Sequence, residues 1–147
     1  MKFSLRNKSV SNSDTVKQLT QIAEEVRVWA EDNSIYGKGI VDCMCAIASY
    51  EIFKRCKKLH IPVRFCVSDF HAYIKFDEII VDVTADQFDK CPKVLVGKLS
   101  GLPNMTGPFE DSIWGELESA TTTKGIRNLL HDWPSEQQPA FVKSTKL

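Results

Sequence analysis

One cysteine, one histidine and one aspartate between Gly39 and Phe88 have the types and the order that thiol-based acyl chemistry needs. Cys45 stands near the start of an apolar segment, and His71 and Asp82 follow on two later segments. In such chemistry a thiolate attacks a carbonyl carbon, a histidine moves the protons, and an acid orients the imidazole ring. The stretch therefore predicts Cys45 as the nucleophile, His71 as its base and Asp82 as the orienting acid.

Each of these residues also has a simpler interpretation. Free cysteine is among the most buried residue types, so any one of the five cysteines is more often structural than catalytic. A strand histidine is more often half-exposed, and His60 and His131 are interpreted in this way. Asp82 is different because it stands among Ile79, Ile80, Val81 and Val83, where a buried carboxylate needs a partner. The position of Asp82 therefore favours a functional role for Cys45, His71 and Asp82 together.

A helix must place the cysteine. We expect it to begin with Asp42 as its N-cap and to end near Leu59, which puts Cys45 at about the third helical position. There the partial positive charge of the helix N-terminus stabilises a thiolate, and free backbone N–H groups can supply part of an oxyanion hole. Cys43 lies about 200° around the helix from Cys45, so the two thiols face different partners. The stripe that predicts the buried face consists of Cys45, Ala48, Ile52, Cys56 and Leu59.

Strands must place the histidine and the aspartate. The period changes to two after Pro62, which predicts strands over 63–67, 70–76 and 79–83. If Asp77-Glu78 forms a two-residue turn, Tyr73 lies opposite Asp82 and His71 opposite Thr84. His71 and Asp82 are then diagonal neighbours on one face of the sheet. A four-residue turn keeps this parity, whereas a three-residue loop does not.

The remaining segments predict a single domain over residues 1–147. Gly37 and Gly39 allow the backbone before the second helix to adopt conformations that other residues disfavour. The other expected elements are a flexible or edge-pairing arm over 1–12, a helix from Ser13-Asp14 to about Asn33, a strand over 94–99, a loop over 100–108, a short helix over 111–120, a helix over 122–131 and a loose tail over 135–147.

Composition excludes several classes of function. The charges of the 19 basic and 19 acidic residues cancel, so no electrostatic attraction to nucleic acid or to a membrane surface is predicted. Cys43-Met44-Cys45 is C-x-C without a second Cys or His pair nearby, so neither a metal nor another cofactor is expected. The odd number of cysteines, the absence of a signal-peptide pattern and the lack of an apolar run of roughly 20 residues predict a cytoplasmic protein. Secretion by a route that needs no signal is also compatible with the sequence.

The central stretch also resembles a known superfamily. CAIASYEIFKRCKKLHIPVRFCV is similar to the nucleophile helix and following strand of transglutaminase-like and papain-like cysteine hydrolases, and HAYIKFDEIIVDVTADQF resembles their His and Asp strands, H-x-W-x-x-x-(D)G-x-x-x-D-x-T. The D-x-T-x-x-Q-F ending looks like that of small bacterial relatives, and the order of motifs is similar to that of lasso-peptide leader peptidases. This resemblance covers about a third of the chain. It implies Cys45 as nucleophile, His71 as base and Asp82 as acid.

The sequence departs from that superfamily at several positions. His60 stands where a Gly usually precedes Ile-Pro, and Tyr73 replaces the common Trp. No glutamine is found about six residues before Cys45, where papain-like enzymes carry an oxyanion donor, and Gly39 occupies that region. The second oxyanion donor is therefore open, with Tyr36 and Tyr73 as candidates.

Together these patterns predict an α+β domain of the papain/transglutaminase-like class, with the nucleophile helix packed on an antiparallel sheet of at least three strands. The expected function is cysteine-dependent hydrolysis or acyl transfer at an amide or peptide bond through a thioester, as in a peptidase, an amidase, a glutamine deamidase or a transglutaminase. A protein or peptide substrate is the expected partner. The alternatives are a binding or inhibitory module without turnover and a structural subunit of an oligomer.

Overall fold

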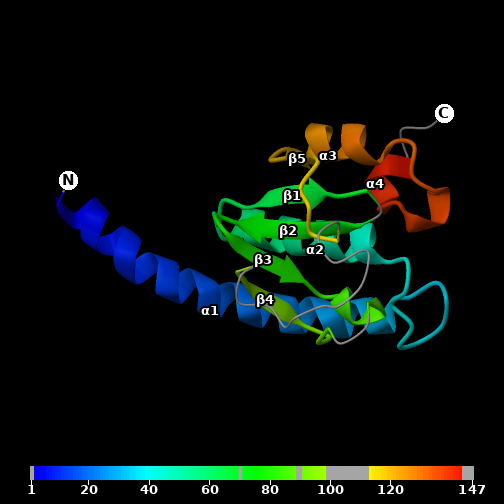
Figure 1. Ribbon diagram of the computed structural model, residues 1–147, viewed down its shortest axis with the longest axis horizontal. Coiled ribbons are helices and arrows are strands. Elements are labelled where there is room, and N and C mark those ends of the chain that lie inside the picture. Colours follow the sequence, from blue (N-terminus) through cyan, green and yellow to red (C-terminus); the bar gives the residue numbers. More distant parts are fainter. Residues whose placement is uncertain (1, 70, 89–90, 99–112, 144–147) are drawn as a thin grey trace.

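The computed structural model describes residues 2–69, 71–88, 91–98 and 113–143 of the 147-residue chain, with side chains from Ser13 onward. It is an α+β fold, as expected (Figure 1). Among these residues, no helix has the length and apolar character needed to cross a bilayer. In chain order the elements are α1 (Lys2–Asp32), α2 (Cys45–Lys58), β1 (Arg64–Val67), β2 (Ala72–Phe76), β3 (Ile79–Asp82), the short 3₁₀ helix η1 (Ala85–Gln87), β4 (Leu95–Lys98), β5 (Glu118–Ala120), α3 (Thr123–Leu130), the 3₁₀ helix η3 (Ser135–Gln137) and α4 (Ala140–Lys143).

The strands form one sheet in the order β4-β3-β2-β1-β5, and every neighbouring pair is antiparallel. The predicted hairpin register is confirmed, because Phe76 pairs with Ile79 and Ile74 pairs with Val81. Asp77 adopts a φ of 48°, as the first central residue of a tight two-residue hairpin turn requires. The parity that puts His71 and Asp82 on one face of the sheet is therefore present.

The two faces of the sheet bury different sets of residues. Helices α1 and α2 pack on one face, which carries the side chains that alternate toward them along β1, β2 and β3 (Figure 1). The opposite face buries a smaller cluster that includes Ile113 and Trp114 from the segment before β5. On the helix side the sheet contributes Phe65, Val67, Ala72, Ile74, Phe76 and Val81, and on the other side Cys66, Tyr73, Ile80 and Leu95.

Helix α1 begins at Lys2, so the predicted N-cap at Ser13-Asp14 is wrong and the expected arm is helical from Lys2 onward. A polar stretch without helix breakers can extend a helix that packing has already nucleated, because each added residue then costs little. The predicted apolar stripe is confirmed over its buried part. Its fully or almost fully buried members are Leu19, Ile22, Ala23, Val26 and Ala30.

Helix α2 begins at Cys45 with Met44 as its N-cap, so the prediction of Asp42 as the cap is wrong. Cys43 adopts a φ of 63°, in the left-handed region, and this conformation cannot be part of a right-handed helix. The buried stripe from Cys45 to Cys56 is confirmed, but Leu59 is 53% exposed. Leu59 lies at the C-cap, where the chain leaves the helix and the helical phase no longer directs the side chain inward.

The C-terminal third differs most from the expectation. No helix forms in the described part of 111–120, where Glu118–Ala120 instead pairs with β1 as β5. The helix expected over 122–131 is confirmed as α3, and Thr122 Oγ1 caps it by accepting the Gly125 N–H at 3.0 Å.

The tail that was expected to be loose is packed over its described part. Gln138 is buried and donates from Nε2 to the carbonyl oxygens of Leu130 at 2.8 Å and Trp133 at 2.9 Å. Val142 in α4 is also buried. The loop predicted over 100–108 and the last four residues lie outside the described part of the chain.

Candidate active site

His71 and Asp82 form a buried pair at the end of the sheet where β2 begins and β3 ends. His71 Nε2 and Asp82 Oδ2 are 2.6 Å apart, and both side chains are 1% exposed. The sequence predicted that these residues would meet, and the structure brings them together. The carboxylate fixes the ring so that Nδ1, its other nitrogen, is directed away from Asp82.

Asp82 is held by three further hydrogen bonds. Trp114 Nε1 donates to Oδ2 at 2.9 Å, while the backbone N–H and the hydroxyl of Thr84 donate to Oδ1 at 3.0 and 3.3 Å. Burial alone raises the pKa of Asp82, but His71 and these donors outweigh it and hold the pKa below its ordinary value. The unusual aspartate in an apolar strand is thus fully partnered and ionised.

His71 carries the complementary shift. Burial alone lowers the pKa of His71, but the charge of Asp82 and the hydrogen bond to it outweigh burial and raise the pKa to about 10, with a smaller contribution from Cys45. Nδ1 accepts no hydrogen bond from the described residues, and Cys45 is the thiol close enough to interact with the ring. The structure therefore joins His71 to Asp82 by a hydrogen bond, and Cys45 lies near enough to the ring to contribute to the pKa of His71.

Cys45 is the first residue of α2 rather than the third. The first intrahelical bond runs from the Ala48 N–H to the Met44 carbonyl at 2.8 Å, so the N–H groups of the first turn precede the hydrogen-bond ladder of the helix. Cys45 is 4% exposed, whereas Cys43 is exposed in the preceding turn. The predicted angle of about 200° between the two thiols does not apply, because Cys43 lies outside α2, but Cys45 is the buried thiol of the two.

Two other cysteines are unsuited to nucleophilic chemistry. Burial raises the pKa of Cys56 and of Cys66 to about 12, and each thiol is fully buried on one side of the sheet. A thiol with such a pKa is protonated at neutral pH. Neither of them competes with Cys45 for the role of nucleophile.

Aromatic rings enclose the imidazole. The ring of Phe88 meets it edge-on, with centroids 4.9 Å apart, and the ring of Tyr73 lies at 6.3 Å. The Tyr73 hydroxyl donates to the carbonyl of Trp114 at 2.8 Å and is buried, so Tyr73 is not free to act as an oxyanion donor. Tyr36 lies in the exposed turn before α2. Tyr73 is therefore excluded as the second oxyanion donor, and that donor stays unassigned.

Arg27 ties helix α1 to the segment that follows Asp82. Its guanidinium donates to the Val83 carbonyl at 3.0 Å and to both carboxylate oxygens of Asp86 at 2.6 and 3.0 Å, and it also contacts Glu31. Arg27 is 6% exposed. Because Val83 follows Asp82 and Asp86 lies two residues before Phe88, this cation fixes the segment between Asp82 and Phe88.

Sequence reasoning missed Arg27 and Trp114. An arginine on the apolar side of the first helix, next to Val26, was the signal for Arg27. The sequence contains no comparable signal for Trp114, because the short helix predicted over 111–120 does not place its side chain near Asp82. Among the described residues, no group of three or more His, Cys, Asp or Glu side chains could hold a metal ion.

A cavity of about 350 Å³ lies beside the loop that leads into β2. It is lined by Asp69, Asp132, Trp133, Pro134 and Gln137. Asp69 stands two residues before His71, so this loop contributes both to the cavity and to the buried pair.

Comparison of the chain with family models, with curated proteins and with solved structures finds no match.

Proposed function

We propose that this chain is a cysteine-dependent hydrolase or acyl transferase of the papain/transglutaminase-like class, acting on an amide or peptide bond. The observation that carries the proposal is the buried His71–Asp82 pair, whose free nitrogen Nδ1 is accompanied by the Cys45 thiol at the start of α2. A structural histidine needs no ionised partner on one side and a thiol on the other. A thiol nucleophile needs both.

The proposed reaction starts from an ion pair in which the proton of Cys45 Sγ lies on His71 Nδ1. The thiolate attacks the substrate carbonyl carbon, and the negative charge that develops on the carbonyl oxygen is met by N–H groups of the first turn of α2. His71 then gives the proton from Nδ1 to the leaving amine as the C–N bond breaks, which leaves a thioester on Cys45.

In the second half a water molecule or an amine attacks the thioester while His71 Nδ1 accepts its proton. The C–S bond breaks, the thiolate of Cys45 is restored and the acid or the new amide leaves. Asp82 stays ionised throughout and stabilises the imidazolium. The chemistry requires no cofactor, and the choice between water and an amine decides between hydrolysis and acyl transfer.

Alkylation by iodoacetamide at pH 7 tests the proposal. In the native wild-type protein we expect Cys45 to be alkylated faster than the exposed Cys43, because His71 activates its thiol. His71→Ala should remove this difference, whereas Cys43→Ala should leave the rate at Cys45 unchanged. Equal labelling of wild type and Cys45→Ala, located by peptide mass spectrometry, would refute the assignment.

A binding or inhibitory module without turnover is the second candidate. The observation that favours it is the burial of the site: Cys45 is 4% exposed, and the described residues bury His71 completely. In that case Cys45 should resist iodoacetamide in the folded protein and react only after denaturation, at the same rate as Cys43. The labelling experiment therefore separates the two functions directly.

A further inference from the structure

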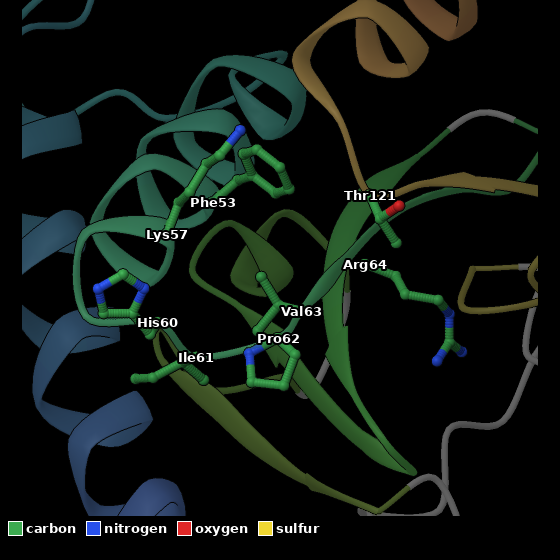
Figure 2. A pocket seen from close by; sticks show the side chains of 8 residues that line it. All are labelled: Phe53, Lys57, His60, Ile61, Pro62, Val63, Arg64 and Thr121. Atoms are coloured by element: carbon green, nitrogen blue, oxygen red, sulfur yellow. The ribbon is translucent and has the colours of Figure 1, made fainter.

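A cavity of about 500 Å³ opens at the far end of α2, away from Cys45. Figure 2 shows Phe53 and Lys57 on the helix side and Pro62 and Val63 on the strand side, with Thr121 across the hollow. The lining is mostly apolar and is completed by His60, Ile61 and Arg64. Because Phe53 and Lys57 follow Cys45 by 8 and 12 helical residues with a rise of 1.5 Å each, this cavity lies about 12–18 Å from Cys45 along the helix.

A second cavity of about 360 Å³ continues along the same helix. Phe53 and Lys57 line both cavities, which makes them parts of one depression. We call this depression the α2 groove. The second cavity adds Tyr50, Lys54, Lys58 and Thr123 to its lining.

The groove combines aromatic rings with uncompensated positive charge. Lys54 pairs with Glu51 at 3.0 Å, and the Arg64 guanidinium points away from the cavity toward Glu116, at 2.9 Å (Figure 2). Lys57 and Lys58 pair with no carboxylate in the described part of the chain, and Lys57 Nζ lies 5.8 Å from the centroid of the Phe53 ring. Lysines in the last turn of a helix stabilise its dipole, but this does not account for the apolar hollow beside them.

The backbone at the edge of the cavity is ready to pair with another strand. The Val67 carbonyl accepts the Leu117 N–H at 3.0 Å, so Val67 directs its backbone groups to the β5 side of β1. Alternation puts Val63 on the same side. The pairing of β1 with β5 ends at Phe65 and Ala120, and the Val63 N–H and C=O have no backbone partner among the described residues.

We propose that the α2 groove binds an extended peptide segment in which apolar and acidic side chains alternate. The peptide backbone pairs with Val63, its apolar side chains enter the hollow beside Phe53, and its carboxylates meet Lys57 and Lys58. The unpaired N–H and C=O of Val63, the residue before β1, favour a peptide over a lipid, because an acyl chain offers them no donor or acceptor. The site does not depend on thiol chemistry, so it can belong to either of the two functions proposed above.

Fluorescence polarisation with a fluorescein-labelled peptide, acetyl-(Leu-Glu)₃-amide, tests the proposal. We expect saturable binding to the wild-type protein and to Cys45→Ser with the same dissociation constant. The double variant Lys57→Glu/Lys58→Glu should weaken binding at least tenfold. The double variant Lys17→Glu/Lys38→Glu, which makes the same charge reversal at two exposed lysines outside the groove, should not change it. Retained binding by Cys45→Ser after failure of the labelling experiment would leave this site standing without the proposed reaction.

Two further probes test the chemistry of recognition. A peptide N-methylated at the amides of one edge should bind at least tenfold more weakly than the peptide methylated on the other edge, because only one edge pairs with Val63. The lysine counterpart, acetyl-(Leu-Lys)₃-amide, should not bind. Equal affinity for both N-methylated peptides, binding of the lysine peptide, or binding of phosphatidylserine vesicles in place of the acidic peptide would overturn the proposal.

Discussion

Replacing Trp114 by Phe removes one hydrogen bond from Asp82 and little else. The indole Nε1 donates to Asp82 Oδ2 at 2.9 Å, and Oδ2 is also the oxygen that holds His71 at 2.6 Å. A phenyl ring keeps most of the apolar contact that Trp114 makes on this face of the sheet. Trp114→Phe therefore weakens the support of the carboxylate that orients the imidazole.

The expected magnitude follows from the charge of the acceptor. A hydrogen bond to an ionised group contributes about 1.5–3 kcal/mol, more than one between neutral groups. We expect the free energy of unfolding to fall by about 2–3 kcal/mol at pH 7 and the melting temperature by about 6 °C or more. Because the Trp114 bond helps to lower the pKa of Asp82, its loss should raise that pKa. The destabilisation should shrink at acidic pH, where Asp82 is protonated in both proteins.

Urea unfolding at pH 7 and at pH 2, together with thermal melts, measures both effects. Trp133→Phe is the matched control, because it makes the same chemical change at a half-buried indole whose N–H has no hydrogen-bond partner in the described residues. Trp133→Phe should lower the free energy of unfolding by less than Trp114→Phe does at pH 7, and its effect should not depend on pH. If the two variants lost equal stability at both pH values, the carboxylate would not depend on Trp114.

Two other predictions concern the same site. Although burial alone lowers the pKa of His71, Asp82 raises it from 6.5 to about 10, so the folded protein holds this proton more tightly than the unfolded chain does. The stabilisation should be complete below about pH 6.5 and be lost as the pH rises to 10, at up to about 1.4 kcal/mol per pH unit in urea unfolding, and this slope should disappear in His71→Gln or Asp82→Asn. A slope that survived in both variants would show that other groups cause it. Arg27→Met should lower the free energy of unfolding by about 3 kcal/mol, because it leaves Asp86 unpaired. It should also slow the alkylation of Cys45, because the segment after Asp82 is no longer held. Glu31→Gln, the control, should lower the free energy of unfolding by less than about 1 kcal/mol. Unchanged stability of Arg27→Met in the same assay would contradict the role of this cation.

Local periodicity predicted the parts of the fold in which neighbours along the chain determine the geometry. The alternation of β2 and β3 with a two-residue turn set the register, and the register alone placed His71 beside Asp82. Helical phase likewise predicted that Cys45 lies on the buried stripe of α2, whereas Cys43 is exposed because it lies outside the helix. The boundaries were less predictable, since α1 starts well before Ser13 and β5 formed where a helix was expected. There, packing against the rest of the molecule outweighed the weak local preferences.

The sequence by itself therefore determined which face of α2 is buried and which face of the hairpin carries the histidine and the aspartate, because side-chain direction repeats with a fixed period along a helix or a strand. Only the tertiary structure decided what surrounds them. Trp114 reaches Asp82 from a segment distant in the chain, and Arg27 reaches Asp86 from the first helix. These contacts depend on how α1 and the segment before β5 pack on the sheet, and no period within a single segment encodes that packing.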